Sequence, residues 1–425
     1  MPASATNIAP HRLRVPGDKS ISHRALILAA LGEGVSQVQG ILNSADVRAS
    51  AQALRLQGVE VLEGPDVWKV TGVTLRGLQA PSEPIDCGNS GTTARLLAGV
   101  IAGAGTRATL VGDESLSRRP MRRVVAPLTR MGAEIRLTSD GTLPMELFGG
   151  ALHEIEWDSE VASAQVKSAI LLAALIAGVP ATVREPQLSR DHTERMLGSR
   201  GVRISSRDGA VRLEPASSLP ATDVRVPADP SSAAFPAAFA AAGGAGLEGV
   251  ELPDVCISPA RAGFLAALER MGASISVTEQ EGWEEPVATL VVRPSELRGI
   301  TVEAGDVPGM VDELPVLACL AALAEGETRI TGAGELRVKE SDRISALVAG
   351  LRAIGADAGE LPDGLVVRGV RRPLAGAVKT HGDHRMAMAF GVLGALPGND
   401  VVVDDPDCVA VSYPEFWNDL GRMRR

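Results

Sequence analysis

Six similar segments recur along the chain, and they limit its fold more than any other feature does. Each begins at a turn marked by glycine or proline, continues as a stretch rich in alanine and leucine, and ends in a few β-branched residues. The six segments read PGDKSISHRALILAALGEG, GNSGTTARLLAGVIAGAGTRATLVG, ASAQVKSAILLAALIAGVPATVRE, DPSSAAFPAAFAAAGGAGLEGVE, GMVDELPVLACLAALAEGETRITG and GDHRMAMAFGVLGALPGNDVVVDD. The pattern predicts a helix followed by a strand, repeated roughly every 70 residues, which exceeds the period of common solenoids. Each repeat is therefore expected to be a small subdomain of strands and helices.

A second helix and strand follow most of these segments. The second elements read ALRLQGVEVLEG, PLTRMGAEIRLT, MLGSRGVRISS, ALERMGASISV and GLRAIGADAGE. In each, a glycine after the last apolar turn predicts the end of a helix, and alternating residues beyond it predict a strand. The sixth repeat lacks this second half, whereas a strand, HRLRVP, precedes the first helix. A strand and a helix missing from opposite ends indicate that the N-terminal strand completes the domain of the last repeat.

The boundary between two groups of three repeats is expected near VRVPADPSSAA, where Pro227 and Pro230 interrupt the chain. We therefore predict one domain over residues 19–226 and a second over residues 227–425, joined by residues 1–18. The alternative is a generic large α/β fold in which the segments are similar by chance.

Composition excludes several classes of partner. The net charge of −10 would repel nucleic acids and anionic membranes, so basic residues that bind an anionic ligand must be focused inside a pocket. The four cysteines lie far apart without a C-x-x-C pair, which argues against zinc and fits a reducing compartment. No signal peptide is evident, and the most apolar stretch, residues 169–179, is too short to cross a bilayer. We expect a cytoplasmic protein.

The repeated helix starts predict anion binding. Free N–H groups and the positive end of the helix dipole point at whatever lies before each start. Cationic side chains occur at or near these starts or in the basic stretch SLSRRPMRR, namely Lys19, Arg24, Arg95, Arg119, Lys167, Lys339, Arg343 and Arg385. Carboxylates accompany them, namely Asp312, Glu313, Glu340 and Asp342. Because carboxylates weaken anion binding, proton transfer is the natural reason for their presence.

Structural roles are the alternative for these residues taken singly. Ser20, Asp312 and Ser341 are suitable helix N-caps, and Lys19 or Arg343 alone would more often be a solvated surface charge. The last two arginines of SLSRRPMRR, Arg122 and Arg123, are expected at the surface. A helix cap and its hydrogen-bond partner would explain Asp383 and His384.

Eight segments together resemble the 5-enolpyruvylshikimate-3-phosphate synthases of the enolpyruvyl transferase family. They are PGDKSISHRALILAAL, GNSGTTAR, SRRPM, SAQVKSA, SRDHTERML, GMVDELPVLA, RVKESDR and GDHRMAM, in order and over nearly the whole chain. The resemblance implies an α/β (α+β) fold of two pseudo-symmetric domains, each of three βαβαββ repeats. It also implies clustered helices, outward strands and an active site in the cleft between the domains.

The resemblance further implies an enzyme of the shikimate pathway, which leads to chorismate and the aromatic amino acids. Such an enzyme transfers the enolpyruvyl group of phosphoenolpyruvate to the 5-hydroxyl of shikimate 3-phosphate and releases phosphate, without a metal or an organic cofactor. By resemblance, shikimate 3-phosphate is contacted by Lys19, Ser20, Arg24, Ser163, Ala164, Gln165, Asp312 and Lys339. Phosphoenolpyruvate is contacted by Lys19, Gly91, Arg119, Gln165, Arg343 and Arg385. Asp312 would be the base, Glu340 the acid, and Lys19 a catalytic assistant.

Three positions depart from the family pattern. Val411 stands where many members have a lysine, so one phosphoenolpyruvate-binding cation is absent or supplied elsewhere. Glu335 stands where some members have asparagine, and Leu96 stands where some relatives have proline. We expect a monomer that glyphosate inhibits competitively, but more weakly than it inhibits members with the lysine and the proline.

Two other functions remain open at this level. A UDP-N-acetylglucosamine enolpyruvyl transferase would have the same fold and donor, but its members usually carry a reactive cysteine where this chain reads GDESLSRRPM. A non-catalytic anion-binding relative is the other alternative, and the joint presence of Lys19, Asp312 and Glu340 argues against it.

Overall fold

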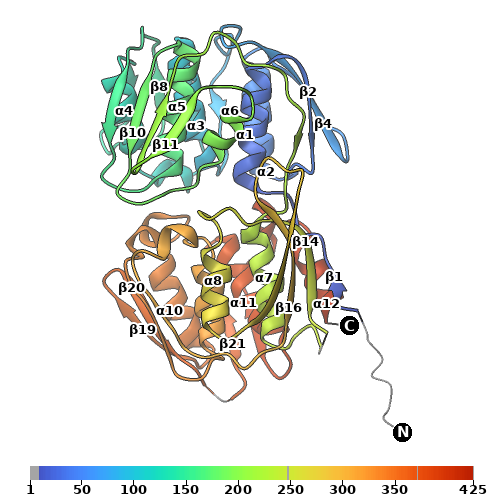
Figure 1. The fold of residues 1–425 in the computed structure, drawn as a ribbon. Coiled ribbons are helices and arrows are strands. Elements are labelled where there is room, and N and C mark those ends of the chain that lie inside the picture. The colour runs from blue at the N-terminus through green and yellow to red at the C-terminus, as the bar shows by residue number, and fades with distance from the viewer. Residues whose placement is uncertain (1–8, 247, 371, 425) are drawn as a thin grey trace. The chain divides into compact units, whose positions relative to one another are not determined.

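Each of the six alanine- and leucine-rich segments forms a helix, and each helix is followed by a strand in the computed structural model (Figure 1). The structure describes residues 9–246, 248–370 and 372–424. It divides into two compact units, the 17–227 unit (Gly17–Pro227) and the 228–425 unit, which is Ala228–Arg425 with the segment that ends at Pro16. The chain passes between the units after Pro16 and after Pro227.

The 17–227 unit contains three repeats, and each has a central helix at or near its start. The first comprises α1 (Lys19–Ala30), β2 (Glu33–Gln39), α2 (Ala45–Leu56), β3 (Glu60–Leu62) and β4 (Val67–Val73). The second comprises β5 (Ile85–Asp86), α3 (Gly91–Ala104), β6 (Ala108–Val111), η1 (Leu116–Arg118), α4 (Arg122–Arg130), β7 (Ile135–Arg136) and β8 (Met145–Leu147). The third comprises β9 (Ile155–Asp158), α5 (Ala164–Ala177), β10 (Ala181–Arg184), α6 (His192–Gly198), β11 (Ile204–Arg207) and β12 (Ala210–Leu213), and β13 (Val224–Arg225) follows.

The 228–425 unit repeats this plan. Its first repeat comprises α7 (Pro230–Ala241), β14 (Val250–Cys256), α8 (Gly263–Arg270), β15 (Ser274–Gln280) and β16 (Val287–Arg293). The next comprises β17 (Thr301–Val302), η2 (Val307–Gly309), α9 (Leu314–Ala321), β18 (Glu327–Ile330), η3 (Gly334–Val338), α10 (Arg343–Ala353), β19 (Asp357–Leu361) and β20 (Gly364–Arg368). The last comprises β21 (Ala375–Val378), α11 (His384–Ala395), β22 (Asp400–Val403), η4 (Asp407–Val411) and α12 (Phe416–Met423), and β1 (His11–Arg12) also belongs to this unit.

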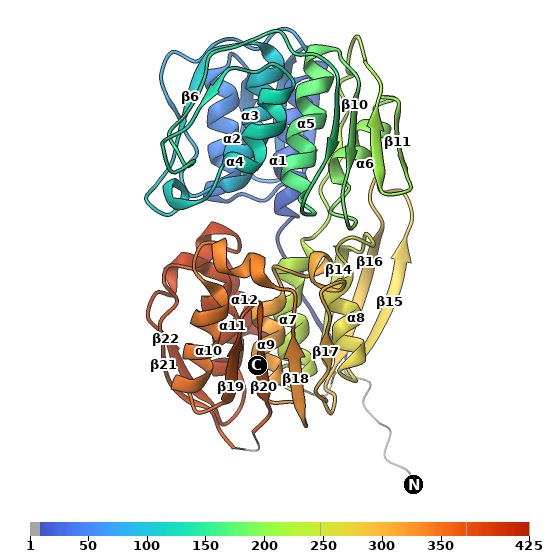
Figure 2. The ribbon, with the colours of Figure 1, turned by 90° about the vertical axis from the view of Figure 1, so that its left-hand side faces the viewer.

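Within each unit the sheets lie outside and the helices fill the interior (Figures 1 and 2). Five sheets have four strands, in the orders β13-β2-β4-β3, β5-β6-β8-β7, β9-β10-β12-β11, β1-β14-β16-β15 and β17-β18-β20-β19, and β21-β22 form a sixth sheet. In each four-stranded sheet the first pair of strands is parallel and the others are antiparallel. The predicted α/β class with repeated strand and helix units is confirmed.

The first strand of one sheet in each unit comes from a distant part of the chain. Strand β1 precedes α1 in sequence but pairs with β14, so that His11 lies opposite Val250. Strand β13 precedes α7 but pairs with β2, so that Val224 lies opposite Val38. Each of these strands therefore completes a sheet in the unit that the chain is about to leave.

The second helices end where the glycines predict. A glycine with positive φ follows α2, α4, α6, α8 and α10 two or three residues after the helix, and a strand comes next. Among the central helices of the described residues, only α11 lacks such a partner helix. There α12 packs instead: the Phe416 ring lies edge-on to Phe235 and Trp417 at centroid distances of 5.8 and 4.8 Å. The Trp417 ring also covers Gly391 of α11, where a Cβ would lie 2.6 Å away. Packing of these aromatic rings thus takes the place of the second helix that this repeat lacks.

Helices α3 and α5 are in backbone contact. A Cβ placed on Gly99 would lie 2.2 Å from the carbonyl oxygen of Ala169, and one on Gly103 would lie 2.7 Å from that of Ala173. Two glycines one turn apart on α3 thus face two alanines one turn apart on α5. This contact sets the two helix starts side by side. Among the described residues, no helix combines the length and apolarity needed to span a membrane.

Replacing Gly99 by alanine should destabilise the 17–227 unit. The new methyl group would meet helix backbone, which cannot rotate away, and overpacking of this kind costs about 1–3 kcal/mol. Thermal unfolding should show a lower Tm. Gly421→Ala is the matched control, because no atom lies within 4 Å of a Cβ at that helical position, and alanine favours a helix. An unchanged Tm for Gly99→Ala would contradict the close packing.

Candidate functional site

The three central helices of the 17–227 unit start at capped turns. Asp18 caps α1 by accepting a hydrogen bond from Ile21 N at 2.8 Å, and Ser90 caps α3 through Thr93 N at 3.1 Å. Ser163 occupies the same place before α5. Ser20 is therefore not the cap of α1, and the capping role considered for it is wrong. The remaining N–H groups of each first turn make these starts suitable for anions.

Lys19, Ser20 and Arg24 lie together on the first turns of α1. The Lys19 ammonium forms an ion pair with Asp46 of α2. Buried Arg24 donates to the carbonyl of Ser20 at 2.8 Å, to Thr193 Oγ1 at 2.7 Å and to Ser168 Oγ at 2.7 Å. These bonds fix the guanidinium and join the starts of α1, α5 and α6.

The starts of α3 and α5 are joined by Gln165. Its side-chain oxygen accepts from Arg95 Nη1 at 2.7 Å, and its amide donates to Thr92 Oγ1 at 3.0 Å. A Cβ on Gly91 would lie 2.9 Å from Arg95 Nη1 and 3.5 Å from Arg119 Nη1. The structure thus brings Gly91 and Gln165 together with two guanidinium groups, and Ser163 and Ala164 directly precede Gln165.

Arg119 is held in place beside the start of α3. Its Nη2 donates to Asn89 Oδ1 at 2.6 Å and to Ser115 Oγ at 3.2 Å. In contrast, Arg122 and Arg123 are exposed, as predicted for surface residues.

A buried histidine lies behind Lys19. His23 Nδ1 and Ser50 Oγ are 2.8 Å apart, and Ser50 in turn is hydrogen-bonded to Thr93 of α3. Burial, with the charges of Lys19 and Arg24, lowers the pKa of His23 well below its ordinary value. The imidazole is therefore neutral at pH 7 and links three helices without adding charge.

Lys167 differs from the other predicted cations. Its ammonium is buried and pairs with Glu185 at 2.9 Å and with Glu194 at 2.8 Å. Burial alone would lower the pKa of Lys167, but the two carboxylates raise it. Burial raises the pKa of Glu194 although Lys167 acts in the opposite direction. Lys167 is thus neutralised inside the protein, and the expectation that it supplies charge to an anion pocket is wrong.

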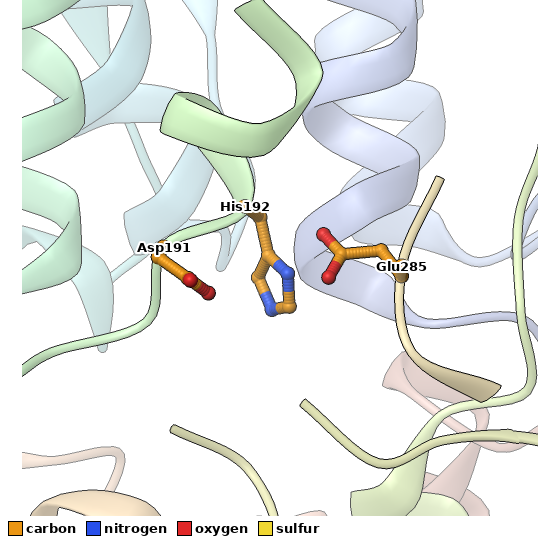
Figure 3. A group of neighbouring side chains, drawn as sticks. All are labelled: Asp191, His192 and Glu285. Carbon is orange, nitrogen blue, oxygen red and sulfur yellow. The ribbon is translucent and has the colours of Figure 1, made fainter. Parts of the chain in front are cut away.

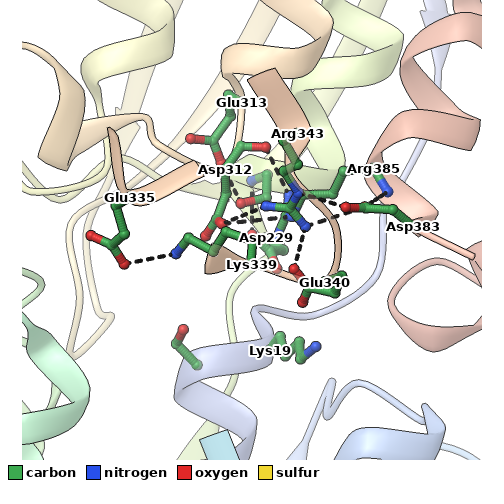
Figure 4. A network of polar contacts seen from close by, with 12 residues as sticks. Lys19, Asp229, Asp312, Glu313, Glu335, Lys339, Glu340, Arg343, Asp383 and Arg385 are labelled. Atoms are coloured by element: carbon green, nitrogen blue, oxygen red, sulfur yellow. Dashed lines mark hydrogen bonds and ion pairs between the residues drawn. The ribbon is translucent and has the colours of Figure 1, made fainter. Parts of the chain in front are cut away.

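In the 228–425 unit, Arg343 collects three carboxylates around one guanidinium (Figure 4). Its Nε donates to Asp383 Oδ2 at 2.8 Å, and its Nη2 donates to Glu340 Oε2 at 2.6 Å. Asp312 Oδ1 lies 3.6 Å from Nη1. Only 1% of the Arg343 side chain is exposed, so the solvated surface role considered for it is wrong.

Charge stabilises this cluster against the cost of burial. Burial alone would lower the pKa of Arg343, but Asp383 and Glu340 raise it above its ordinary value. Burial would raise the pKa of Asp383, yet Arg343 holds it below its ordinary value. Asp383 also caps α11 by accepting from Arg385 N at 3.0 Å, and it accepts from Ser341 Oγ at 3.0 Å. The cap expected at Asp383 is confirmed, but its partner is Arg385 rather than His384.

Asp312 and Arg385 complete the cluster. Arg385 Nη1 donates to the backbone oxygen of Asp312 at 3.2 Å, and its Nε lies 3.7 Å from Asp312 Oδ1. Asp312 is not a helix cap, because Glu313 occupies the cap position of α9. Likewise Asp342, not Ser341, caps α10, through Ser345 N at 3.1 Å. Capping therefore explains neither Asp312 nor Ser341.

Lys339 lies in the same loop as Glu340 but has a different partner. Its ammonium is 3.0 Å from Glu335, which is one of the three departures from the family pattern. The second departure, Val411, is half-buried at the end of η4, and the third, Leu96, is buried in α3. An ion pair thus replaces the hydrogen bond that an asparagine at position 335 could supply.

Several polar partners were missed by sequence reasoning. The carboxylate of Asp46 pairs with Lys19, and that of Asp229 pairs with Arg261 at 2.7 Å. Both aspartates are buried. The hydroxyl of Ser231, at the start of α7, accepts a hydrogen bond from Arg261 Nη2 at 3.0 Å and donates one to Glu313 Oε1. It therefore links the second pair to Glu313. Only the recurrence of a polar residue before each central helix could have pointed to Asp229.

A second polar loop precedes α6. Figure 3 shows Asp191 and His192 there. Asp191 accepts from Arg195 Nε at 2.8 Å, and His192, the first residue of the helix, is buried. Within either unit taken alone, the described residues form no group of three side chains that could hold a metal ion.

The arrangement combines two chemical capacities. Guanidinium and ammonium groups at helix starts can bind phosphate and carboxylate groups through charge-assisted hydrogen bonds. Carboxylates held against Arg343 can accept protons from a bound molecule and donate protons to it.

The chain is similar to known proteins over almost its whole length. The family model of EPSP synthase (3-phosphoshikimate 1-carboxyvinyltransferase) matches residues 8–420. A 3-phosphoshikimate 1-carboxyvinyltransferase of Sulfurihydrogenibium is 47% identical over 421 residues, 97% of each chain. One of Xanthomonas euvesicatoria is 50% identical over 408 residues, 95% of this chain and 92% of the relative. The solved EPSP synthase of Acinetobacter baumannii is 39% identical, with a TM-score of 0.84 over 98% of this chain and 96% of the other.

Proposed function

The chain belongs to the EPSP synthase (3-phosphoshikimate 1-carboxyvinyltransferase) family, and we propose that it catalyses the reaction for which that family is named. It transfers the enolpyruvyl group of phosphoenolpyruvate to the 5-hydroxyl of shikimate 3-phosphate and releases phosphate. The observation that carries this proposal is the match over residues 8–420, in which every residue with a proposed role lies. The Arg343 cluster supports it, because acid–base groups and anion-binding groups share one network there.

Shikimate 3-phosphate is bound by two sets of residues in this proposal. The 17–227 unit contributes residues at the starts of α1 and α5, namely Lys19, Ser20, Arg24, Ser163, Ala164 and Gln165. The 228–425 unit contributes Asp312 and Lys339. Helix starts and cations suit a ligand with both a phosphate and a carboxylate.

Phosphoenolpyruvate is bound mainly by guanidinium groups in this proposal. Arg343 and Arg385 of the 228–425 unit and Arg119 of the 17–227 unit present planar N–H forks to its oxygens. Lys19, Gly91 and Gln165 complete the set. The absence of a side chain at Gly91 lets the substrate approach the backbone closely.

Proton transfer is assigned to two carboxylates. Asp312 accepts the proton of the 5-hydroxyl group, and the oxygen of that hydroxyl group forms a bond to C2 of phosphoenolpyruvate. Glu340 donates a proton to the methylene carbon, which gives a phosphoketal in which that carbon is a methyl group. Elimination then returns a proton from the methyl group to Glu340, breaks the bond from C2 to the phosphate oxygen and restores the double bond, and the proton held by Asp312 leaves with the phosphate. Lys19 stabilises the charge that develops at the tetrahedral centre.

The proposed reaction changes no oxidation state, so it calls for no redox group, and we propose that it needs no metal, as the family resemblance implies. We place the enzyme in the cytoplasm, since none of the four cysteines, all of which the structure describes, forms a disulfide, which fits a reducing compartment. We propose that it acts as a monomer and binds no nucleic acid, in keeping with its net charge of −10.

Phosphate release tests the proposed function directly. The purified protein should release phosphate from phosphoenolpyruvate only when shikimate 3-phosphate is present, because the 5-hydroxyl is the nucleophile. Equal release with UDP-N-acetylglucosamine would assign the chain to the other enolpyruvyl transferase reaction. If neither acceptor supports phosphate release, the chain is a non-catalytic relative.

Neutral substitutions of the acid and base should abolish most turnover. Asp312→Asn and Glu340→Gln keep the size of each side chain, and each should lower kcat at least about 100-fold, the usual scale for a general acid or base. Substrate binding should change much less. Asp342→Asn is the control, because asparagine also caps a helix and Asp342 pairs with Arg337 rather than Arg343. Near-normal turnover in both variants would refute the assigned roles.

Glyphosate should inhibit competitively with phosphoenolpyruvate, and Gly91→Ala should weaken this inhibition. A Cβ at Gly91 meets the end of the Arg95 side chain, which can move, so the fold should survive. The methyl group then occupies space that the larger inhibitor needs more than the substrate does. The inhibition constant should rise about tenfold or more, the scale of a steric clash, and the KM for phosphoenolpyruvate by much less. Inhibition that Gly91→Ala does not alter would mean that Gly91 does not line the site, and Gly421→Ala serves again as the control.

A further inference from the structure

The segment between β10 and the first turn of α6 has no role in the function proposed above. It contains most of the motif SRDHTERML, which contributed to the family resemblance but to none of the predicted site residues. The segment nevertheless contacts two central helix starts. Arg190 Nη1 lies 3.3 Å from Ser20 Oγ, and Thr193 Oγ1 accepts from Arg24 Nε at 2.7 Å. A third contact, from Glu185, reaches the start of α5.

Glu185 is bonded at both of its oxygens. Oε1 accepts from the backbone N–H of Ser163 at 2.8 Å, and Oε2 accepts from Ser189 Oγ at 2.7 Å. Ser163 is the N-cap residue of α5, and its own side chain accepts from Val166 N at 3.5 Å. The capping bond is long, so the shorter bond from the Ser163 N–H to Glu185 contributes more to fixing Ser163.

Lys167 fixes Glu185 from inside the unit. Its ammonium contacts Oε2 of Glu185 at 2.9 Å and Oε1 of Glu194 at 2.8 Å. The exposed fractions of these side chains are 3% for Lys167, 6% for Glu185 and 9% for Glu194. A buried carboxylate beside an anion site would repel the ligand unless a cation neutralised it, and Lys167 supplies that cation.

We propose that Glu185 is a positioning residue for shikimate 3-phosphate, acting through the backbone N–H of Ser163, with Lys167 neutralising its charge. The inference rests on the proposed function, because that function makes Ser163, Ala164 and Gln165 substrate ligands. These three residues are consecutive at the start of α5, so loss of the bond at Ser163 loosens all three together. Phosphoenolpyruvate depends on Gln165 alone among them, and Gln165 has two further bonds to α3. The effect should therefore be larger for shikimate 3-phosphate.

Glu194 is the matched comparison. It pairs with the same ammonium at nearly the same distance and burial, but it lies in α6, and among the described residues no hydrogen bond joins it to Ser163. Removing either carboxylate deprives Lys167 of one partner, so Glu185→Ala and Glu194→Ala should lower Tm by similar amounts. Only Glu185→Ala removes the acceptor of the Ser163 N–H.

The experiment measures Tm, kcat and both KM values for the full-length protein and the two alanine variants. Glu185→Ala should raise the KM for shikimate 3-phosphate about tenfold or more, the scale expected for a lost hydrogen bond to a charged group. The KM for phosphoenolpyruvate should stay within about threefold on the same scale. Glu194→Ala should leave both KM values near those of the unaltered enzyme. Calorimetric titration of shikimate 3-phosphate in the absence of phosphoenolpyruvate should show the same loss of affinity.

Two further variants separate positioning from charge and from folding. Glu185→Gln removes the charge but keeps an oxygen for the Ser163 N–H, so its KM for shikimate 3-phosphate should lie closer to the original value than that of Glu185→Ala. If Glu185→Ala does not fold, Glu185→Met fills the space without offering an acceptor to the Ser163 N–H, leaves Lys167 paired with Glu194, and should show the same raised KM.

Three results would overturn the proposal. They are equal KM increases in Glu185→Ala and Glu194→Ala, equal increases for both substrates in Glu185→Ala, and an unchanged KM for shikimate 3-phosphate in a folded variant that lacks Glu185. The unaltered enzyme distinguishes this failure from failure of the proposed function. If it makes no enolpyruvyl product, the proposed function fails whatever the variants do.

Discussion

Burial of the central helices is the constraint from which the rest of the structure follows. All twelve residues of α7 and all eight of α9 are buried, and most of α1, α3, α5 and α11 is buried as well. Helices that are covered on nearly every side have no polar face. Their polar groups can lie only at their ends, where free N–H groups also need partners. Both the anion-binding residues and the carboxylates of the proposed enzyme are therefore concentrated at helix starts.

Charges at those starts must be paired because they are partly or wholly buried. Arg343, Lys167 and Arg261 are each held by at least one carboxylate within the same unit. Less buried cations are paired too, as in the contacts of Lys19 with Asp46 and Lys339 with Glu335. A substrate that binds Lys19 or Lys339 must therefore compete with a carboxylate. The two pairs differ in how easily they break, because Glu335 is exposed whereas Asp46 is buried, and an ion pair with an exposed partner contributes little to stability.

Local patterns in the sequence were sufficient to predict the repeats, the helix ends and the fold class. The glycines that stop α2, α4 and α8 act through their own backbone conformation, so that neighbouring residues reveal them. The missing halves at opposite ends of the chain indicated that the N-terminal strand joins the second domain, but its pairing with β14 could not be read, because a two-residue strand carries no mark of its distant partner. The same holds for α12, whose role depends on rings meeting Gly391 and Phe235 far along the chain.

Side-chain partners were the least predictable part of the candidate site. Proposed ligands such as Lys19 were found by resemblance, but their partners, such as Asp46, come from other elements and share no motif with them. Capping, the alternative considered for Ser20, Asp312 and Ser341, is wrong for all three, because each lies one or two residues from the residue that occupies the cap position. For Asp312 this error matters chemically. A carboxylate that caps a helix is occupied by backbone N–H groups, whereas Asp312 meets two guanidinium groups.

The two buried clusters share an imbalance that bears on how anions could bind beside them. Lys167 meets two carboxylates and Arg343 meets three, so each of these central cations has more than one negative partner. An excess of carboxylates disfavours an incoming phosphate at short range. The opposing contribution must come from groups that carboxylates do not fully neutralise, namely the first-turn N–H groups and the dipoles of the capped helices. Precise placement of those N–H groups is then as important for affinity as the number of cations, and the bond from Ser163 N–H to Glu185 acts on that placement at the start of α5.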